Sequence, residues 1–261
     1  MADLRSACAD KSEPPTDIDE PYITKYHIPD SPRADSEFKF GFFITTKKLS
    51  GILDQATILH ADGTYNLNWN GFPVLVTGTS DSDGHFHPAG LGVTYGETHL
   101  DYEFIFSALK EASPEFNPEV LVADNADAIH NAFDAVFGQK IHVNCWAHVI
   151  DKAQKRIIGI KSKKIREAVI ADIYALQLSK SEAEFLAGKK LWQKKWLNHE
   201  ATSDFAKYFS EQYLTRHCGW YEGAYLKCPS TNNCLEATNK WIKAPGTFRE
   251  RLSLDGSFKW L

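Results

Sequence analysis

The chain has 261 residues, which is enough for one large domain or two small ones. Hydrophobic residues make up 43% and charged residues 24%, as in an ordinary globular protein. No apolar stretch approaches the roughly 20 residues that a transmembrane helix needs, which argues against a helical membrane protein. The five cysteines have irregular spacing, which does not indicate a disulfide framework and favours the reducing interior of a cell.

The net charge of −5 at pH 7 conceals an uneven distribution. Residues 1–37 hold nine Asp and Glu against four Lys and Arg, whereas residues 151–200 hold twelve Lys and Arg against six Asp and Glu. A basic region on an otherwise balanced chain indicates a surface that faces a polyanion. The alternative is that these charges only solvate the exposed sides of helices. The densest part of the region consists of Lys161, Lys163, Lys164 and Arg166.

The first half of the chain predicts an α/β pattern. Residues 1–37 are rich in Asp, Ser and Pro and predict a disordered lead-in. Three strands are then expected at 56–65, 73–79 and 89–95, because turn sequences such as Asn70-Gly71 separate short apolar runs. Such strands form an antiparallel meander.

The following residues alternate between helix and strand signals. Apolar residues recur at helical spacing over 100–112, and a short apolar run at 120–123 predicts a buried strand. A second helical stripe runs from Ile129 to Phe137 and stops at Gly138, and a fifth strand is expected at 141–146. The expected order is therefore β-β-β-α-β-α-β.

The rest of the chain is expected to be helical. Ser181 and Glu184 predict a capping box, followed by Trp192 and Trp196 as core residues four positions apart. A last helix is expected from Asn232 to Lys243, and the sequence then ends without a stop signal, consistent with a fragment of a longer protein. The expected organisation is a lead-in at 1–37, a first part of an α/β core at 38–149, a helical insertion at 150–225 and a second part of the core at 226–261.

Three carboxylates occupy informative places in this pattern. Asp62 ends the first expected strand, Asp124 ends the fourth, and Glu236 lies on the last helix. In a mixed sheet of this order the two strands can lie side by side, and sites are common at such strand ends. Carboxylate oxygens suit Mg²⁺ or Mn²⁺, and two such ions are the usual means of breaking phosphodiester bonds.

Each carboxylate also has a simpler interpretation. Asp62 precedes Gly63 and could be a turn residue, while Asp124 could cap the following helix. Glu236 could form an ordinary surface pair with Lys240. The nearest rival ligands are Asp127 and Glu222.

Cys145 and His148 lie between the second and third carboxylates along the chain. One interpretation is half of a structural zinc site, completed by two further cysteines. A second is a buried thiol and a hydrogen-bonded imidazole without chemistry. A third places both residues beside a catalytic centre. The cysteines that could complete a zinc site are Cys218, Cys228 and Cys234.

Four strings resemble the signature blocks of the Mutator-like element (MULE) transposases: ADGTY, VADNADAIHNAFDAVFG, NCWAHV and STNNCLEATNKWIK. The resemblance covers roughly residues 55–243. It implies a DDE enzyme with a ribonuclease H-like mixed sheet, in which an all-helical insertion separates the fifth strand from the Glu-bearing helix. The zinc-finger cysteine patterns that accompany this domain in full family members are not found in the sequence.

The resemblance assigns Asp62, Asp124 and Glu236 to catalysis and to binding two Mg²⁺ or Mn²⁺ ions. Cys145 and His148 match the C-x-x-H motif of the family, which is expected close to the active site. The implied function is metal-dependent cleavage of DNA at transposon ends and strand transfer into target DNA. The implied partner is double-stranded DNA, in a nuclear homo-oligomeric transposition complex and without a membrane.

DNA contacts are expected from the basic region and from one face of the last helix. The alternative function is a domesticated, non-catalytic DNA-binding regulator derived from such a transposase. A ribonuclease H-like nuclease outside transposition would not explain the TNN…E and C-x-x-H blocks. The expected DNA-binding residues are Lys161, Lys163, Lys164, Arg166, Asn232, Asn239, Lys240 and Lys243.

Overall fold

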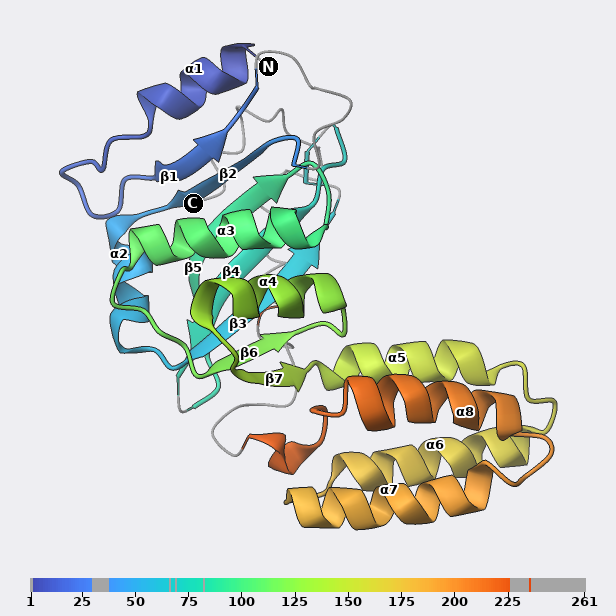
Figure 1. The fold of residues 1–261 in the computed structure, drawn as a ribbon. Helices are drawn as coiled ribbons and strands as arrows, with labels where there is room; N and C mark the ends of the chain where they lie inside the picture. Colours follow the sequence, from blue (N-terminus) through green and yellow to red (C-terminus); the bar gives the residue numbers. More distant parts are fainter. Residues whose placement is uncertain are drawn as a thin grey trace. The chain divides into compact units, whose positions relative to one another are not determined.

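Figure 1 shows the computed structural model, which describes residues 2–29, 38–65, 67–68, 70–81, 83–225 and 235. One seven-stranded sheet has the strand order β1-β2-β5-β4-β3-β6-β7. The chain divides into two compact units, 1–121 with 126–141 and 233–261, and 122–125 with 142–232. The strands are β1 (Tyr22–His27), β2 (Gly41–Thr45), β3 (Ile58–Thr64), β4 (Val74–Ser80), β5 (Phe86–Thr94), β6 (Val120–Ala123) and β7 (Ile141–Asn144).

The predicted three-strand meander is confirmed. β3 pairs antiparallel with β4, and β4 pairs antiparallel with β5. The helices expected at 100–112 and 129–137 are α3 (His99–Ala112) and α4 (Asp127–Phe137), and the strands expected after them are β6 and β7. The α/β class is therefore confirmed as a mixed sheet with helices.

β3, β6 and β7 run in the same direction. The backbone N–H groups of Glu119 and Val120 both donate to the carbonyl of Thr57, so β3 and β6 begin beside each other. Ile141 at the start of β7 donates to Glu119, and Cys145 just after β7 donates to Ala123 at the end of β6. Matching ends of the strands therefore pair, as in a parallel arrangement.

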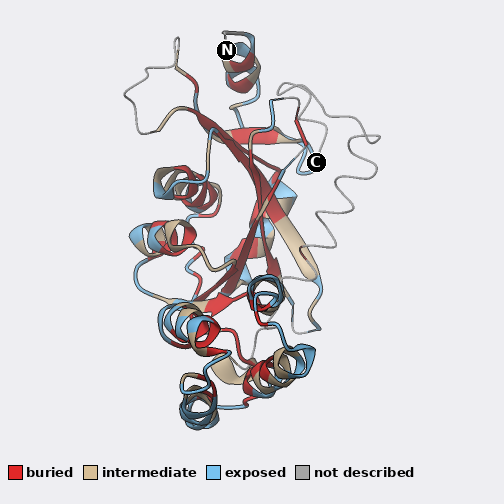
Figure 2. Cartoon of the chain, turned by 90° about the vertical axis from the view of Figure 1, so that its right-hand side faces the viewer, coloured by how far each residue is buried: buried red, intermediate tan, exposed pale blue. Residues whose placement is uncertain are grey.

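α3 and α4 lie side by side over one face of the sheet (Figure 1). α3 begins in a capping box, in which Thr98 and Asp101 each accept a backbone N–H of the other. The rings of Phe106 on α3 and Phe133 on α4 pack edge to face with centroids 5.7 Å apart. Figure 2 shows that the strands are mostly buried and that helices expose their outer sides.

The amino-terminal region differs from the expected disordered lead-in. It forms α1 (Ala2–Asp10) and β1, and β1 pairs antiparallel with β2, which the sequence did not predict either. Leu4, Cys8 and Ile23 are buried in one core cluster with apolar residues of β2, β4 and β5. Short apolar patches therefore hold these elements on the sheet, although Asp and Pro dominate the composition around them.

The second unit is built from α5 (Trp146–Ile157), α6 (Lys163–Gln177), α7 (Glu182–Trp196) and α8 (Ser203–Glu211). α8 continues into a π-helix at Gln212–Arg216, and a short 3-10 helix follows at Glu222–Ala224. No helix in the described ranges is long and apolar enough to cross a membrane.

Aromatic side chains form most of the core of this unit. Trp192 and Trp196 are buried in it, as predicted from their spacing. Trp220 stacks on Trp146 and donates its indole N–H to the carbonyl of Tyr213. The predicted cap of α7 is present, because Ser181 accepts the backbone N–H of Glu184. The Glu184 carboxylate accepts from the backbone of Lys180 rather than from Ser181.

Two glycines test how tightly the sheet packs. A Cβ placed on Gly90 in β5 would lie 2.7 Å from a ring carbon of Phe43 and 2.8 Å from the carbonyl oxygen of Ile44. A Cβ on Gly51 would meet nothing within 4 Å, and its backbone is helical with φ −62°.

We predict opposite effects on stability from the same substitution at these two positions. Gly90→Ala should lower the free energy of unfolding by about 1–3 kcal/mol, because Phe43 must move. Gly51→Ala should raise it by about 0.4–1 kcal/mol by restricting the unfolded chain. Urea denaturation followed by circular dichroism measures both. Equal midpoints for Gly90→Ala and the parent protein would contradict the close contact.

Candidate functional site

Asp62 lies inside β3, at the end of a row of apolar residues that crosses the sheet. Directly paired residues form this row, which runs from β1 to β3. The four other members are apolar and buried, and Asp62 is 9% exposed. β3 continues for two residues beyond Asp62, so Asp62 neither ends the strand nor belongs to a turn. In order, the row is Ile23, Ile44, Leu91, Val76 and Asp62.

Leu235 is buried in the core cluster on the sheet face that carries this row. It is therefore part of the first unit, although 113 residues or more separate it from the strands of the meander. Glu236, the expected third carboxylate, lies outside the described residues. The same holds for Asn232, Asn239, Lys240, Lys243, Cys228 and Cys234.

A further carboxylate, Glu97, approaches β3 from the loop before α3. A Cβ on Gly63 would lie 2.7 Å from Glu97 Oε1, and the Tyr65 hydroxyl donates to the Glu97 carboxylate. Because successive residues of a strand face opposite sides, Glu97 meets the side of β3 away from Asp62. The sequence analysis missed Glu97, since only the absence of a side chain at Gly63 hints at it.

Asp124 belongs to the second unit and directly follows β6. The N-cap residue of α4 is Ala126, so the interpretation of Asp124 as the cap is wrong. Burial raises the pKa of Tyr213, and a hydrogen bond from Tyr208 and the charges of Tyr208 and Asp124 raise it further. The Asp124 carboxylate thus lies within electrostatic reach of the Tyr213 hydroxyl.

Two buried polar side chains near the ends of β6 and β7 lack hydrogen-bond partners. Asn125 has neither its amide nitrogen nor its oxygen bonded, and His148 has no partner for Nδ1. Leaving such groups unpaired costs about 1–3 kcal/mol each. Unsatisfied groups of this kind mark positions where a ligand completes the hydrogen bonds. The sequence analysis named His148 but missed Asn125.

Cys145 is buried at the N-terminus of α5, and its backbone N–H donates to Ala123. This bond places the start of the C-x-x-H motif beside the end of β6. Cys218 is an exposed free thiol. Among the described residues, no group of three or more His, Cys, Asp or Glu side chains could hold a metal ion, so Cys145, His148 and Cys218 do not form a zinc site by themselves.

The rival carboxylates have other roles or positions. Glu222 accepts a hydrogen bond of 2.7 Å from Gln177 and lies 3.8 Å from Lys180, so it links the end of α6 to the 3-10 helix. Asp127 is the first residue of α4 and is partly exposed.

The basic residues at the start of α6 are not equivalent. Arg166 donates to the backbone carbonyls of Ile160 and Lys161, and therefore ties α6 to the preceding turn. Lys163 lies 3.7 Å from Glu167 in an exposed pair, and Lys161 and Lys164 are exposed. The lysines are therefore better placed than Arg166 to contact a polyanion.

Comparison with known protein families identifies part of the chain. Residues 58–152 match the family model of the MULE transposase domain. The match begins at the first residue of β3 and ends within α5, so that it includes Asp62, Asp124, Cys145 and His148. No curated protein matches the chain. The resemblance found in the sequence is confirmed over these residues, and the chain carries a MULE transposase domain.

Proposed function

We propose that this chain is the catalytic part of a DDE transposase, which cleaves DNA at transposon ends and joins the ends to target DNA. The observation that carries the proposal is Asp62: a carboxylate replaces an apolar side chain in an apolar row, within the residues that match the MULE domain. A charged group in such a position is costly unless ions or polar groups compensate it.

The order of elements supports a ribonuclease H-like core. The meander β3-β4-β5 is followed by α3, β6, α4 and β7, as the resemblance implies, and β1 and β2 extend the sheet beyond it. We propose core segments at 38–149 and 226–261, with residues 150–225 as the helical insertion.

Asp62, Asp124 and Glu236 would hold two Mg²⁺ or Mn²⁺ ions. Two observations support this set: β3 and β6 are neighbours in the strand order, and Leu235, which precedes Glu236, packs on the sheet face that carries Asp62. The donor set consists only of carboxylates, which suits hard divalent ions. When bound, the ions supply an activated water and neutralise the phosphate charge.

The residues beside Asp124 would position the DNA. The Asn125 amide and the His148 imidazole each have a buried atom available for a hydrogen bond. Donation from these groups to phosphate oxygens would orient the phosphodiester, because such contacts fix register without reading sequence. This role accounts for their unsatisfied state in the protein alone.

The same proposal sets the partners and location. The substrate is double-stranded DNA, the lysines of the insertion and of the last helix contact its phosphates, and the protein acts in the nucleus as a homo-oligomer. The retention of all three carboxylates in the sequence supports the enzyme over a domesticated DNA-binding regulator.

Removing any one carboxylate should abolish DNA nicking. Asp62→Asn, Asp124→Asn and Glu236→Gln should each lower the Mn²⁺-dependent nicking rate by more than about a hundredfold, because loss of even an outer-shell partner costs ten- to a hundredfold. DNA binding at low salt should persist. Asp127→Asn and Glu222→Gln serve as controls and should retain activity. Parent-like nicking in one of the three variants would remove that residue from the site.

Asn125→Ala should separate stability from activity. Because the Asn125 amide has no partner, its loss should leave the free energy of unfolding unchanged or raise it by up to about 1 kcal/mol, while nicking falls. Asn68 is the matched control: its buried amide makes two hydrogen bonds with Phe72, so Asn68→Ala should cost about 1–3 kcal/mol. Full activity of Asn125→Ala would show that Asn125 does not touch DNA.

The lysines of the insertion should give salt-dependent, sequence-tolerant DNA binding. Replacing Lys161, Lys163 and Lys164 by Ala should reduce the slope of log affinity against log salt by about 2 to 3, since each phosphate contact contributes about 0.9. Arg166 is kept because it supports the backbone. A variant with Ala at Lys11, Lys47 and Lys48 loses the same charge from the first unit. Equal slopes for the two variants would show that the insertion lysines only face solvent.

A further inference from the structure

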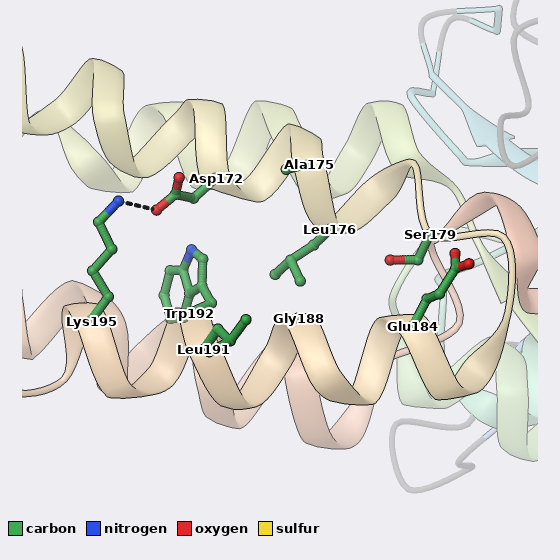
Figure 3. Close-up of a pocket in the computed structure, with 9 residues that line it drawn as sticks. All are labelled: Asp172, Ala175, Leu176, Ser179, Glu184, Gly188, Leu191, Trp192 and Lys195. Carbon is green, nitrogen blue, oxygen red and sulfur yellow. Dashed lines mark hydrogen bonds and ion pairs between the residues drawn. The ribbon is translucent and has the colours of Figure 1, made fainter.

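A groove of about 410 Å³ lies between α6 and α7, wholly within the second unit. Figure 3 shows its polar ends and apolar middle. An ion pair of 2.7 Å between Asp172 and Lys195 closes one end, and Ser179 and Glu184 lie at the other. Ala175, Leu176, Gly188, Leu191 and Trp192 line the middle.

Trp192 has a buried hydrogen-bond donor without a partner. Its side chain is 3% exposed, and its indole nitrogen has no hydrogen-bond partner. Figure 3 shows this nitrogen pointing across the groove toward α6. Buried indole N–H groups usually find acceptors, as Trp196 does on Asp172 and Trp220 does on Tyr213. Trp192 therefore indicates a ligand that brings an acceptor into the groove.

The groove is open and apolar in a way that suits a helix. Leu191 is 69% exposed, and Leu186 and Tyr174 on the same two helices are also exposed. Ala175 and Gly188 add little bulk to the walls of the groove. The lining residues of α7 span Glu184 to Lys195, about 16 Å, which is the length of three helical turns. Exposed apolar surface around a pocket marks a site for a protein partner.

The charges around the groove specify an acidic partner. Lys190 and Lys194 are exposed on α7, and neither forms an ion pair with a described residue. Asp172 is already neutralised by Lys195 and accepts from Trp196, so it does not repel an incoming carboxylate. A carboxylate could therefore accept from Trp192 and be attracted by the two lysines at once.

We propose that the groove between α6 and α7 docks an acidic amphipathic helix of a partner protein. Apolar side chains of that helix at i, i+3 or i+4, and i+7 fill the middle of the groove. One carboxylate accepts the Trp192 N–H, and its acidic flank faces Lys190 and Lys194. This surface is distinct from the proposed carboxylate site and does not depend on transposase activity.

Selection from a display library of random 14-residue peptides tests the proposal with the full chain. Binders are selected on the parent protein after depletion on Ala175→Leu, which fills the groove from an exposed position. The enriched peptides should share helical apolar spacing and an excess of Asp and Glu. No enrichment beyond that obtained on Ala175→Leu, or enrichment of basic peptides, would overturn the proposal.

Titration of one selected peptide then examines each contact. Trp192→Phe keeps the ring and removes the donor, so the dissociation constant should rise about three- to tenfold. Lys190→Glu with Lys194→Glu should weaken binding further at low salt than at high salt. The controls are Ala183→Leu, exposed on α7 outside the groove lining, and Lys207→Glu on α8, and both should bind as the parent protein does.

Two other occupants would show themselves in the same variants. Loss of duplex DNA binding in Ala175→Leu, with no peptide effect, would assign the groove to nucleic acid and overturn the proposal. Self-association in sedimentation that Ala175→Leu abolishes would assign it to a second copy of the chain and overturn it equally.

Discussion

The apolar row that crosses five strands is the constraint on which the first unit depends. Ile23, Ile44, Leu91 and Val76 pair side by side, and they belong to a core cluster that also buries α1 and Leu235. Continuity of this cluster fixes the strand register, because a slip by one residue would turn every apolar side chain to the other face. The same register fixes Asp62 at the end of the row, so packing holds the carboxylate in place.

Local patterns were sufficient to predict the centre of the fold. Turn sequences and apolar periodicity located the meander, α3, β6, α4 and β7, because each of these elements carries its own signal. β1 and α1 carry weak signals: a few buried residues hold them on β2, while Asp and Pro between them suggest disorder. Composition over a window averages these few residues away, so contacts with a distant strand were needed to find the elements.

The candidate site shows the same division between local and distant information. Asp62, Asp124, Cys145 and His148 could be named from short strings. Glu97 beside Gly63 could not, because the contact joins residues far apart in sequence. Nor could the sequence separate Arg166, which holds two backbone carbonyls, from the exposed lysines around it. Net charge identifies a basic region, whereas hydrogen bonding decides which of its residues are available to a ligand.

Unsatisfied buried groups give independent information about function, because folding alone selects against them. In the second unit they occur at Asn125 and His148, near the end of β6 and the start of α5, and at Trp192 in the groove between α6 and α7. Most of the other indoles and amides discussed above are bonded, so loose packing of the unit does not explain these exceptions. One set adjoins a carboxylate of the proposed catalytic site, and the other adjoins exposed leucine and lysine side chains. The chemistry surrounding each set, polar in one case and apolar with a basic rim in the other, therefore assigns DNA to the first and a protein helix to the second.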